Sequence, residues 1–338
     1  MGKTEIGWTD FSVNPIRARL AGSGKTRGGY DSGVGHYCEK VSAGCRNCYS
    51  SALQPKFGLP QFQEQRNGAT ESFLDGSKFE EVLRRKKPTK FFWCDMTDMF
   101  GSWVPFEWIA ACFGVMAATP QHTHQVLTKR PDRALEFFAW LAAQDRDQPR
   151  LEVVWQALRE ETERVGDDGP MHTKHCASPE GPWPLPNVHL GVSCEDQTAA
   201  DKRIPVLLQC PAAVHWISAE PLLGPITLWG DDEGCLRGPG VIVSGGMTPS
   251  TPYEHSEGYD DSYPGLDWVV VGGESGPNRR ECDPAWIDDI VAQCSAADVA
   301  CFVKQDSALK PGQRGRLSDA TWAHKEFPLK LPTTDRIG

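Results

Sequence analysis

The sequence lacks the features that mark several large classes of protein. None of its apolar runs is long enough to span a bilayer, so we expect no membrane association. No apolar core of a signal peptide follows Met1, so we expect a cytoplasmic protein. The net charge of −10 argues against broad, charge-driven binding of duplex nucleic acid, although it leaves room for a local basic groove.

Most of the cysteines stand singly along the chain. The 338 residues include 12 cysteines, and in a long intracellular chain these are expected to be reduced rather than paired in a disulfide framework. Cys112, Cys210 and Cys294 have apolar neighbours, which is typical of small core residues. These three predict packing rather than chemistry.

Three other cysteines are crowded into one loop. Cys38, Cys45 and Cys48 have the spacing C-x6-C-x2-C, and Tyr49 follows the third. Thiolates are soft ligands, suited to zinc or to iron–sulfur clusters. Because no fourth ligand is obvious nearby, the trio predicts a metal centre with an open position, which is typical of catalytic sites. A structural zinc with a distant fourth ligand, or cysteines that bind nothing, are the alternatives.

Short apolar runs alternate with helical segments along most of the chain. The predicted strands lie within Thr4–Val13, Lys90–Cys94, Thr123–Leu127, Asn187–Val192, Ala213–Ile217, Leu266–Val271 and Val299–Val303. The predicted helices are Tyr49–Phe57, Ser77–Arg85, Pro105–Ala118, Asp132–Gln144, Val153–Val165, Ala200–Leu208 and Pro284–Ala296. This alternation predicts an α/β fold with parallel strands, in the form of a full or partial (β/α) barrel; an open doubly wound sheet is the alternative.

We expect one barrel-like domain, residues 1–338, with two surface insertions. The insertions cover about 145–186 and about 229–264 and are rich in charged residues, glycine and proline. The basic, glycine-rich stretch from Arg17 to Gly35 predicts a further loop. His172, His175 and Cys176 in the first insertion are of types that bind metals, although histidines in such an acidic insertion are more often unliganded.

Polar residues stand where the predicted strands end. They are Asp95, Asp98, Lys129, Arg130, Ser193, Glu195, Ser218, Glu220, Glu274, Ser275, Lys304 and Gln305. In (β/α) barrels the active site lies at the carboxyl ends of the strands. The repetition of polar residues at successive strand ends predicts a polar active-site opening at the carboxyl end of the barrel. Any single position is explained equally well by the polar loop that commonly follows a strand.

Over most of its length, the chain resembles the uncharacterised phage and bacterial family called gp thirty-seven/gp sixty-eight. The matching stretches are Trp8-Thr9-Asp10 with Asn14-Pro15, Cys38 with 41–49, 95–100, 119–123, 127–131, 190–193 with Glu195-Asp196, 218–222, 272–276 and 302–305. That family in turn looks like radical S-adenosylmethionine enzymes, mainly through the cysteine loop and the barrel rhythm.

The resemblance implies an iron–sulfur enzyme. Three cysteines would bind three irons of a [4Fe–4S] cluster, and the fourth iron would bind S-adenosylmethionine. An electron from a donor protein would then cleave the sulfonium and give a 5′-deoxyadenosyl radical. The phage association implies a nucleotide or nucleic-acid base as substrate, and the bacterial host cytoplasm as location if a phage encodes the chain.

The same resemblance assigns roles to the strand-end residues. The expected cofactor-binding residues are Asp95, Asp98, Arg130, Ser193, Gly272, Gly273, Glu274 and Ser275, and the expected catalytic residues are Lys129, Glu195 and Glu220. Gly272, Gly273 and Glu274 would approach the methionine end of the cofactor, unless the glycines serve only a tight turn. The aspartates would bind ribose or substrate, Lys129 and Arg130 a phosphate or carboxylate, and the two catalytic glutamates would handle protons.

Two other functions are compatible with the same residues. The first is a nucleic-acid-binding or partner-binding protein in which the cysteines hold a structural zinc or an inert cluster. The second is a magnesium-dependent nuclease or hydrolase that uses the acidic strand ends. Metal analysis of variants of the three cysteines separates the enzyme from the binding protein, and activity that survives loss of all three would favour the hydrolase.

Overall fold

The computed structural model describes residues 2–4, 6–21, 33–65, 70–144, 150–165, 181–228 and 265–328. The chain forms two compact units: unit 1 contains Met1–Gly191 and Cys210–Ala213, and unit 2 contains Val192–Gln209 and Val214–Gly338. The boundary falls within strand β8 (Val188–Ser193). The predicted insertion at about 229–264 lies outside the described residues, as do residues 145–149 and 166–180 of the first insertion, which include His172, His175 and Cys176.

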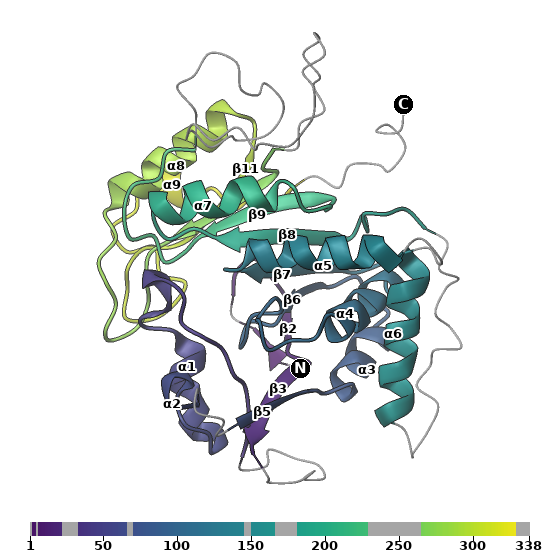
Figure 1. Ribbon diagram of the computed structural model, residues 1–338. Coiled ribbons are helices and arrows are strands. Elements are labelled where there is room, and N and C mark those ends of the chain that lie inside the picture. The colour runs from purple at the N-terminus through teal and green to yellow at the C-terminus, as the bar shows by residue number, and fades with distance from the viewer. Residues whose placement is uncertain are drawn as a thin grey trace. The chain divides into compact units, whose positions relative to one another are not determined.

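Unit 1 contains a sheet with the strand order β1-β2-β6-β7-β8. Figure 1 labels β2, β6, β7 and β8 of this sheet. Its strands are β1 (Gly2–Lys3), β2 (Phe11–Val13), β6 (Lys90–Trp93), β7 (Thr123–Thr128) and β8. Strand β1 is antiparallel to β2, whereas β2, β6 and β7 are parallel. Among the described residues of the predicted first strand, Thr4–Val13, only those of β2 form a strand, and β1 precedes the predicted range.

The helices of unit 1 pack through aromatic side chains and one glycine. They include α3 (Ser77–Leu83), α4 (Phe106–Ala118), α5 (Pro131–Gln144) and α6 (Arg150–Val165). Phe113 of α4 contacts Phe137 of α5, with ring centroids 5.3 Å apart. A Cβ on Gly114 would collide with the carbonyl oxygen of Val154, so the absence of a side chain lets α4 and α6 approach closely.

A second, three-stranded sheet in unit 1 corrects one expectation. Strands β4 (Val34–Gly35), β3 (Ile16–Leu20) and β5 (Thr70–Leu74) pair antiparallel in that order. The prediction of a loop from Arg17 to Gly35 is therefore wrong for the residues of β3 and β4. Ile16 and Ala18 are buried while Arg17 and Arg19 are not, which is the alternation of a half-buried strand.

Four short helices lie between β4 and β5 along the chain. They are the 3₁₀ turns η1 (Ala43–Cys45) and η2 (Gln54–Phe57) and the helices α1 (Tyr49–Leu53) and α2 (Phe62–Gln65). The predicted helix Tyr49–Phe57 is confirmed as α1 followed directly by η2. Gln54 fixes the segment because its side-chain oxygen accepts from His36 N (2.8 Å) and its amide donates to Ser50 O (2.7 Å).

Unit 2 continues the pattern of strand and helix. Its strands are the end of β8, β9 (Val214–Ala219), β10 (Trp268–Gly272) and β11 (Ala300–Gln305), and its helices are α7 (Gln197–Leu207), α8 (Pro284–Ala296) and α9 (Asp319–Trp322). Strand β10 is parallel to both β9 and β11. Every residue of β9 and β10 is buried, as expected for parallel strands covered on both faces.

The predicted α/β fold with parallel strands is confirmed. The order of the described strands runs β2-β6-β7-β8-β9-β10-β11 without reversing. A doubly wound sheet reverses its order at a switch point. The observed order is compatible with a partial (β/α) barrel.

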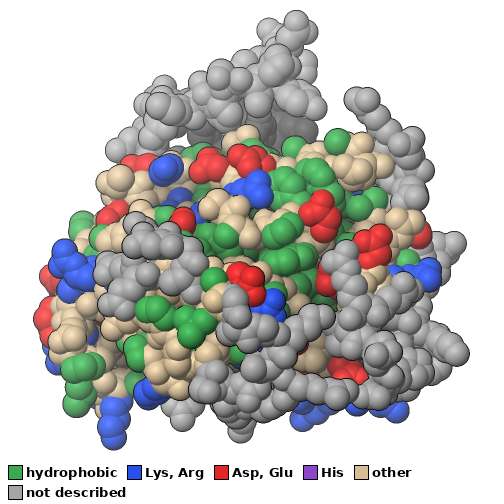
Figure 2. Space-filling view, turned by 60° about the horizontal axis from the view of Figure 1, so that its bottom comes forward, with side chains coloured by type: hydrophobic (Ala, Val, Ile, Leu, Met, Phe, Trp, Pro, Cys, Tyr) green, Lys and Arg blue, Asp and Glu red, His purple; other side chains and the backbone are tan. Residues whose placement is uncertain are grey.

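Two further expectations concern a broad basic surface for nucleic acid and helices that could span a membrane. On the face drawn in Figure 2, Lys and Arg side chains of the described residues are scattered among acidic ones rather than gathered into a broad basic area. Among the described residues, no helix combines the length and the apolar character needed to cross a membrane.

Candidate metal centre

The second and third cysteines of the loop are positioned by local turns. Cys45 closes η1, where its N–H donates to Ser42 O (3.1 Å) and its Sγ lies 3.8 Å from Ser42 Oγ. Cys48 stands directly before α1, and its carbonyl accepts from Ala52 N (3.2 Å). Two successive helical turns therefore contribute to the positions of these two cysteines.

The three thiols are close enough to influence one another electrostatically. Burial raises the pKa of Cys38 most, and the charges of Asp98, Cys48 and Cys45 raise it further while Arg130 opposes them. Burial likewise raises the pKa of Cys48, Cys45 adds to this, and Lys129 lowers it. Since such charge effects weaken with distance, the three thiols lie in the same neighbourhood. All three side chains are partly exposed.

Two cationic residues from the end of β7 flank the cysteines. Lys129 and Arg130 follow that strand, and Asp98, from the loop after β6, binds both. Asp98 Oδ1 accepts from Phe100 N (3.0 Å) and Thr128 Oγ1 (2.7 Å), and Oδ2 accepts from Lys129 N (3.1 Å) and the Arg130 guanidinium (2.8 Å). Protein donors thus fill the roughly four acceptor positions of this carboxylate.

Asp95 ties the cysteine loop to the end of β6. Its Oδ1 accepts from Asn14 Nδ2 (2.5 Å), and Tyr49 Oη donates to its carbonyl (2.8 Å) and to Oδ2 (3.0 Å). Burial raises the pKa of Asp95, and these hydrogen bonds oppose the rise. The preceding residue, Cys94, has φ 59°, a conformation that is uncommon outside glycine, asparagine and aspartate and that clusters at functional sites.

The arrangement of donors falls short of a preformed metal cage. Within the described ranges, no three His, Cys, Asp or Glu side chains are grouped so as to hold a single metal ion. The cysteine loop instead offers three neighbouring thiols, cations beside them and carboxylates that other protein groups already occupy.

In unit 2, the two expected catalytic glutamates are both paired with cations. Glu195 has 1% of its side chain exposed, and Arg203 donates to its Oε2 (2.8 Å) and to Ser193 O (2.6 Å). Glu220 follows β9, and its Oε1 accepts from Lys304 Nζ of β11 (2.5 Å). Glu220 and Lys304 keep 16% and 17% of their side chains exposed, so this pair remains accessible whereas Glu195 is enclosed.

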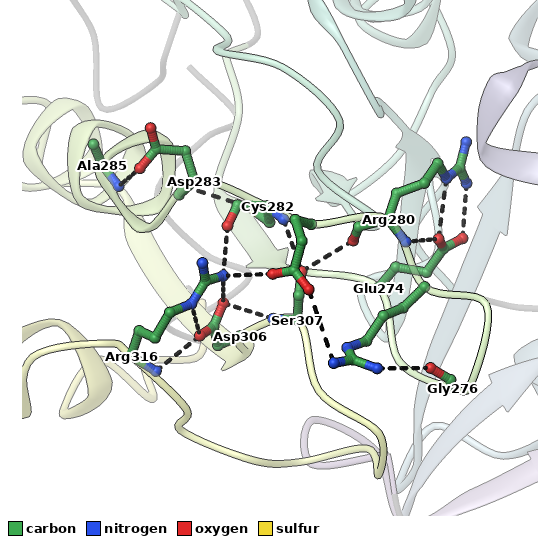
Figure 3. Close-up of polar contacts among 11 residues, drawn as sticks. Glu274, Gly276, Arg280, Cys282, Asp283, Ala285, Asp306, Ser307 and Arg316 are labelled. Carbon is green, nitrogen blue, oxygen red and sulfur yellow. Dashed lines mark hydrogen bonds and ion pairs between the residues drawn. The ribbon is translucent and has the colours of Figure 1, made fainter.

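Residues that follow β10 are held by hydrogen bonds and close packing with other protein groups, as Figure 3 shows for Glu274 and Arg280. Arg280 holds Glu274 through Nε to Oε2 (3.0 Å) and a terminal nitrogen to Oε1 (2.7 Å). A Cβ on Gly273 would lie 2.5 Å from Ser307 N, so this glycine is required by the close approach of the chain after β11. Ser275 forms a parallel bridge with Ala308.

The prediction from sequence missed a second carboxylate–arginine pair in the same region. Asp306 is fully buried, and Arg316 donates to both of its oxygens (2.8 and 2.7 Å) and to Cys282 O (2.7 Å). Ser307 links the two pairs, because its hydroxyl accepts from Cys282 N (2.8 Å) and donates to Arg280 O (3.1 Å), as Figure 3 shows. No local motif signals these partners.

The fold and the site define a class: an α/β protein with parallel strands and a three-cysteine loop. The family model described as a protein of unknown function, DUF5131, matches residues 26–326. The chain therefore belongs to this family. No curated protein and no solved structure matched the chain.

Proposed function

We propose that the chain is a radical S-adenosylmethionine-type iron–sulfur enzyme that binds a [4Fe–4S] cluster through Cys38, Cys45 and Cys48. The observation that carries the proposal is that the three cysteines lie in one short, partly exposed loop, with the Arg130 guanidinium bonded to the carbonyl of Glu39 in the same loop. Three cysteine ligands leave one iron of such a cluster open to a small molecule.

The residues around the thiols fit a cluster of this kind. Thiolates are the usual ligands of iron–sulfur clusters, and neighbouring cations reduce the cost of gathering three negative sulfurs. Lys129 lowers the pKa of Cys48, and Arg130 acts in the same direction on Cys38. The donor set is therefore chemically suited to iron and sulfide.

When bound, such a cluster supplies the electron for reductive cleavage of S-adenosylmethionine to methionine and a 5′-deoxyadenosyl radical. The tasks of the chain's own residues follow from their contacts. The three cysteines would bind the cluster, and Lys129 and Arg130 would offset the negative charge of the thiolates. Asn14, Asp95 and Tyr49 hold the segment after Cys48 against the end of β6.

In unit 2, we assign proton or substrate contacts to Glu220 with Lys304, because this pair is partly exposed. Glu195 and Glu274 are held by arginines, so we assign them to maintaining the loops rather than to direct chemistry. An electron donor protein and a nucleotide or nucleic-acid base remain the proposed partner and substrate class, supported by the resemblance described above. A cytoplasmic location is part of the same proposal.

The test is anaerobic isolation and reconstitution of the full chain. We expect about four iron and four sulfide ions per chain, and 5′-deoxyadenosine after addition of S-adenosylmethionine and dithionite. Alanine at Cys38, Cys45 or Cys48 should abolish the product.

The matched control is Cys112→Ala, which removes a buried cysteine of α4 and should leave the iron content unchanged. One zinc per chain in place of iron, or an iron-loaded protein that forms no 5′-deoxyadenosine above the control, would count against the proposal. Zinc that is retained, with unfolding on chelation, would instead favour the binding protein.

A further inference from the structure

We propose that Arg130, fixed by Asp98, is the positioning residue that holds Cys38 in register with the other two cysteines. The inference rests on the proposed function, because it concerns the ligand set of the proposed cluster. It adds to that function an explanation of how Cys38, which six residues separate from Cys45, is held near the other two cysteines.

Cys38 is set apart from the other two cysteines by the local structure. Six residues separate it from Cys45, and the turn η1 begins only at Ala43. Its Sγ lies 3.7 Å from Glu39 O, within its own segment. The helical turns that fix Cys45 and Cys48 therefore leave Cys38 to be placed by residues from elsewhere.

Those residues bind the carbonyl groups on both sides of Cys38. Thr97 Oγ1 donates to Tyr37 O (2.5 Å), and the Arg130 guanidinium donates to Glu39 O (3.2 Å). Trp103 completes the contact, because its ring lies 4.8 Å from the ring of Tyr37 and 4.9 Å from the Arg130 guanidinium carbon. The segment is thus held against the loops that follow β6 and β7.

Arg130 is able to hold the segment because its own position is constrained. Asp98 accepts from its guanidinium at 2.8 Å, and the carboxylate is in turn fixed by three other protein donors. Only 13% of the Arg130 side chain is exposed. A planar guanidinium held in this way can offer its remaining N–H groups in fixed directions.

The Arg130 guanidinium also affects the electrostatic surroundings of the Cys38 sulfur. Burial alone would lower the pKa of Arg130, but Asp98 and Cys38 together raise it, which places the cation beside the thiol. Hydrogen bonds to ligand sulfurs and the net charge around a cluster set its reduction potential. Arg130 is therefore expected to influence both the geometry and the potential.

Thiol labelling of the metal-free protein tests the geometric part without any cluster. N-Ethylmaleimide labelling of each cysteine would be followed by mass spectrometry over a series of pH values, and each rate would be expressed per thiolate, because loss of the Arg130 cation also raises the pKa of Cys38. In Arg130→Gln, the Cys38 thiolate should be labelled about tenfold faster, as expected for loss of a charge-assisted hydrogen bond, while Cys45 and Cys48 keep their rates. Asp98→Asn, which leaves Arg130 in place but less constrained, should give a smaller increase.

Arg133→Gln is the matched control. Arg133 lies one turn further along α5, stacks on Phe106 at 3.9 Å, pairs with Glu136 and donates to Val104 O, but none of these partners belongs to the cysteine loop. It should leave Cys38 labelling unchanged. Unchanged or slower labelling of Cys38 in a folded Arg130→Gln protein would overturn the inference.

Redox titration of the reconstituted protein tests the role in charge. At a fixed potential, Arg130→Gln should lower the ratio of reduced to oxidised cluster about tenfold, equivalent to about 59 mV for one electron. Arg130→Lys keeps the charge and should recover most of the potential, but not the protection of Cys38. An unchanged potential in Arg130→Gln would contradict the inference. A wild-type protein that binds no cluster refutes the proposed function, and the labelling result then still decides the inference.

Discussion

The cysteine loop of unit 1 and the arginine–carboxylate pairs of unit 2 differ in whether their polar side chains are already bonded to other protein groups. In unit 2, Glu274 and Asp306 each receive two hydrogen bonds from one guanidinium. In unit 1, three soft donors lie together in a partly exposed loop, and the carboxylate near them is occupied by other protein groups.

The difference teaches how to separate residues that hold loops from residues that receive a ligand. A buried carboxylate whose acceptor positions are filled by arginine is already neutralised, so it contributes to a fixed arrangement of chain. Thiols that lie together beside cations, with no carboxylate–arginine pairing of their own, are instead available as soft ligands for a metal. The comparison predicts that substitutions in unit 2 reduce stability, whereas substitutions of the cysteines remove metal.

The largest expected effect is loss of the buried pair in unit 2. Arg316→Ala leaves the fully buried Asp306 without its partner and should lower the free energy of unfolding by about 3 kcal/mol, near the low end for buried pairs because Arg316 is half exposed. Urea denaturation measures this. Arg314→Ala is the control, since its partner Asp319 is 90% exposed, and should cost less than about 1 kcal/mol. Equal losses in the two variants would remove the distinction between closed and exposed pairs.

A smaller effect is expected from filling the close approach after β10. A Cβ on Gly273 would lie 2.5 Å from Ser307 N and 2.6 Å from its Oγ, so Gly273→Ala should destabilise by about 2 kcal/mol through overpacking. Gly224→Ala has open space around its Cβ and should change stability by less than about 1 kcal/mol. Thermal unfolding compares the two variants. A neutral Gly273→Ala would reopen the possibility that this glycine is kept for approach to a cofactor.

The third prediction contrasts a neutral buried group of unit 1 with the paired charges of unit 2. Burial lowers the pKa of His124 to about 3, and Trp93 Nε1 donates to its Nδ1 at 3.0 Å. The folded protein therefore keeps His124 neutral where the unfolded chain, with a pKa near 6.5, takes up a proton. Stability is lost as the pH falls from about 6.5 towards 3, by at most about 1.4 kcal/mol per unit from this residue.

The check is the free energy of unfolding in urea at pH 6.5 and 5.5. His124→Gln should reduce the loss between these two values, whatever its effect at pH 6.5. An identical loss in wild type and variant would show that this histidine does not contribute to acid sensitivity.

Much of the fold was accessible from sequence because its signals are local. Helix α8 was predicted with its observed bounds, Pro284–Ala296, since Asp283 caps it and Pro284 suits its first turn. The strands β6 to β11 follow from short apolar runs with polar ends. The strand β3 was missed because arginine, glycine and lysine dominate its surroundings, although Ile16 and Ala18 carried the alternating pattern.

The candidate site was accessible only in part. The spacing of the cysteines and the strand ends indicated Cys38, Asp98 and Arg130, because both signals are short patterns in the chain. The sequence did not indicate which residue pairs with each carboxylate, because the pairing of Asp98 with Arg130, or of Glu195 with Arg203, depends on how separate segments pack. Sequence alone therefore could not separate occupied carboxylates from accessible ones.

The most direct test of the central claim is the electron paramagnetic resonance spectrum of anaerobically isolated, dithionite-reduced protein. We predict the signal of a reduced [4Fe–4S] cluster that changes when S-adenosylmethionine is added and is absent when Cys38, Cys45 and Cys48 are all replaced by alanine. A protein that is silent under these conditions and carries one zinc per chain would contradict the account.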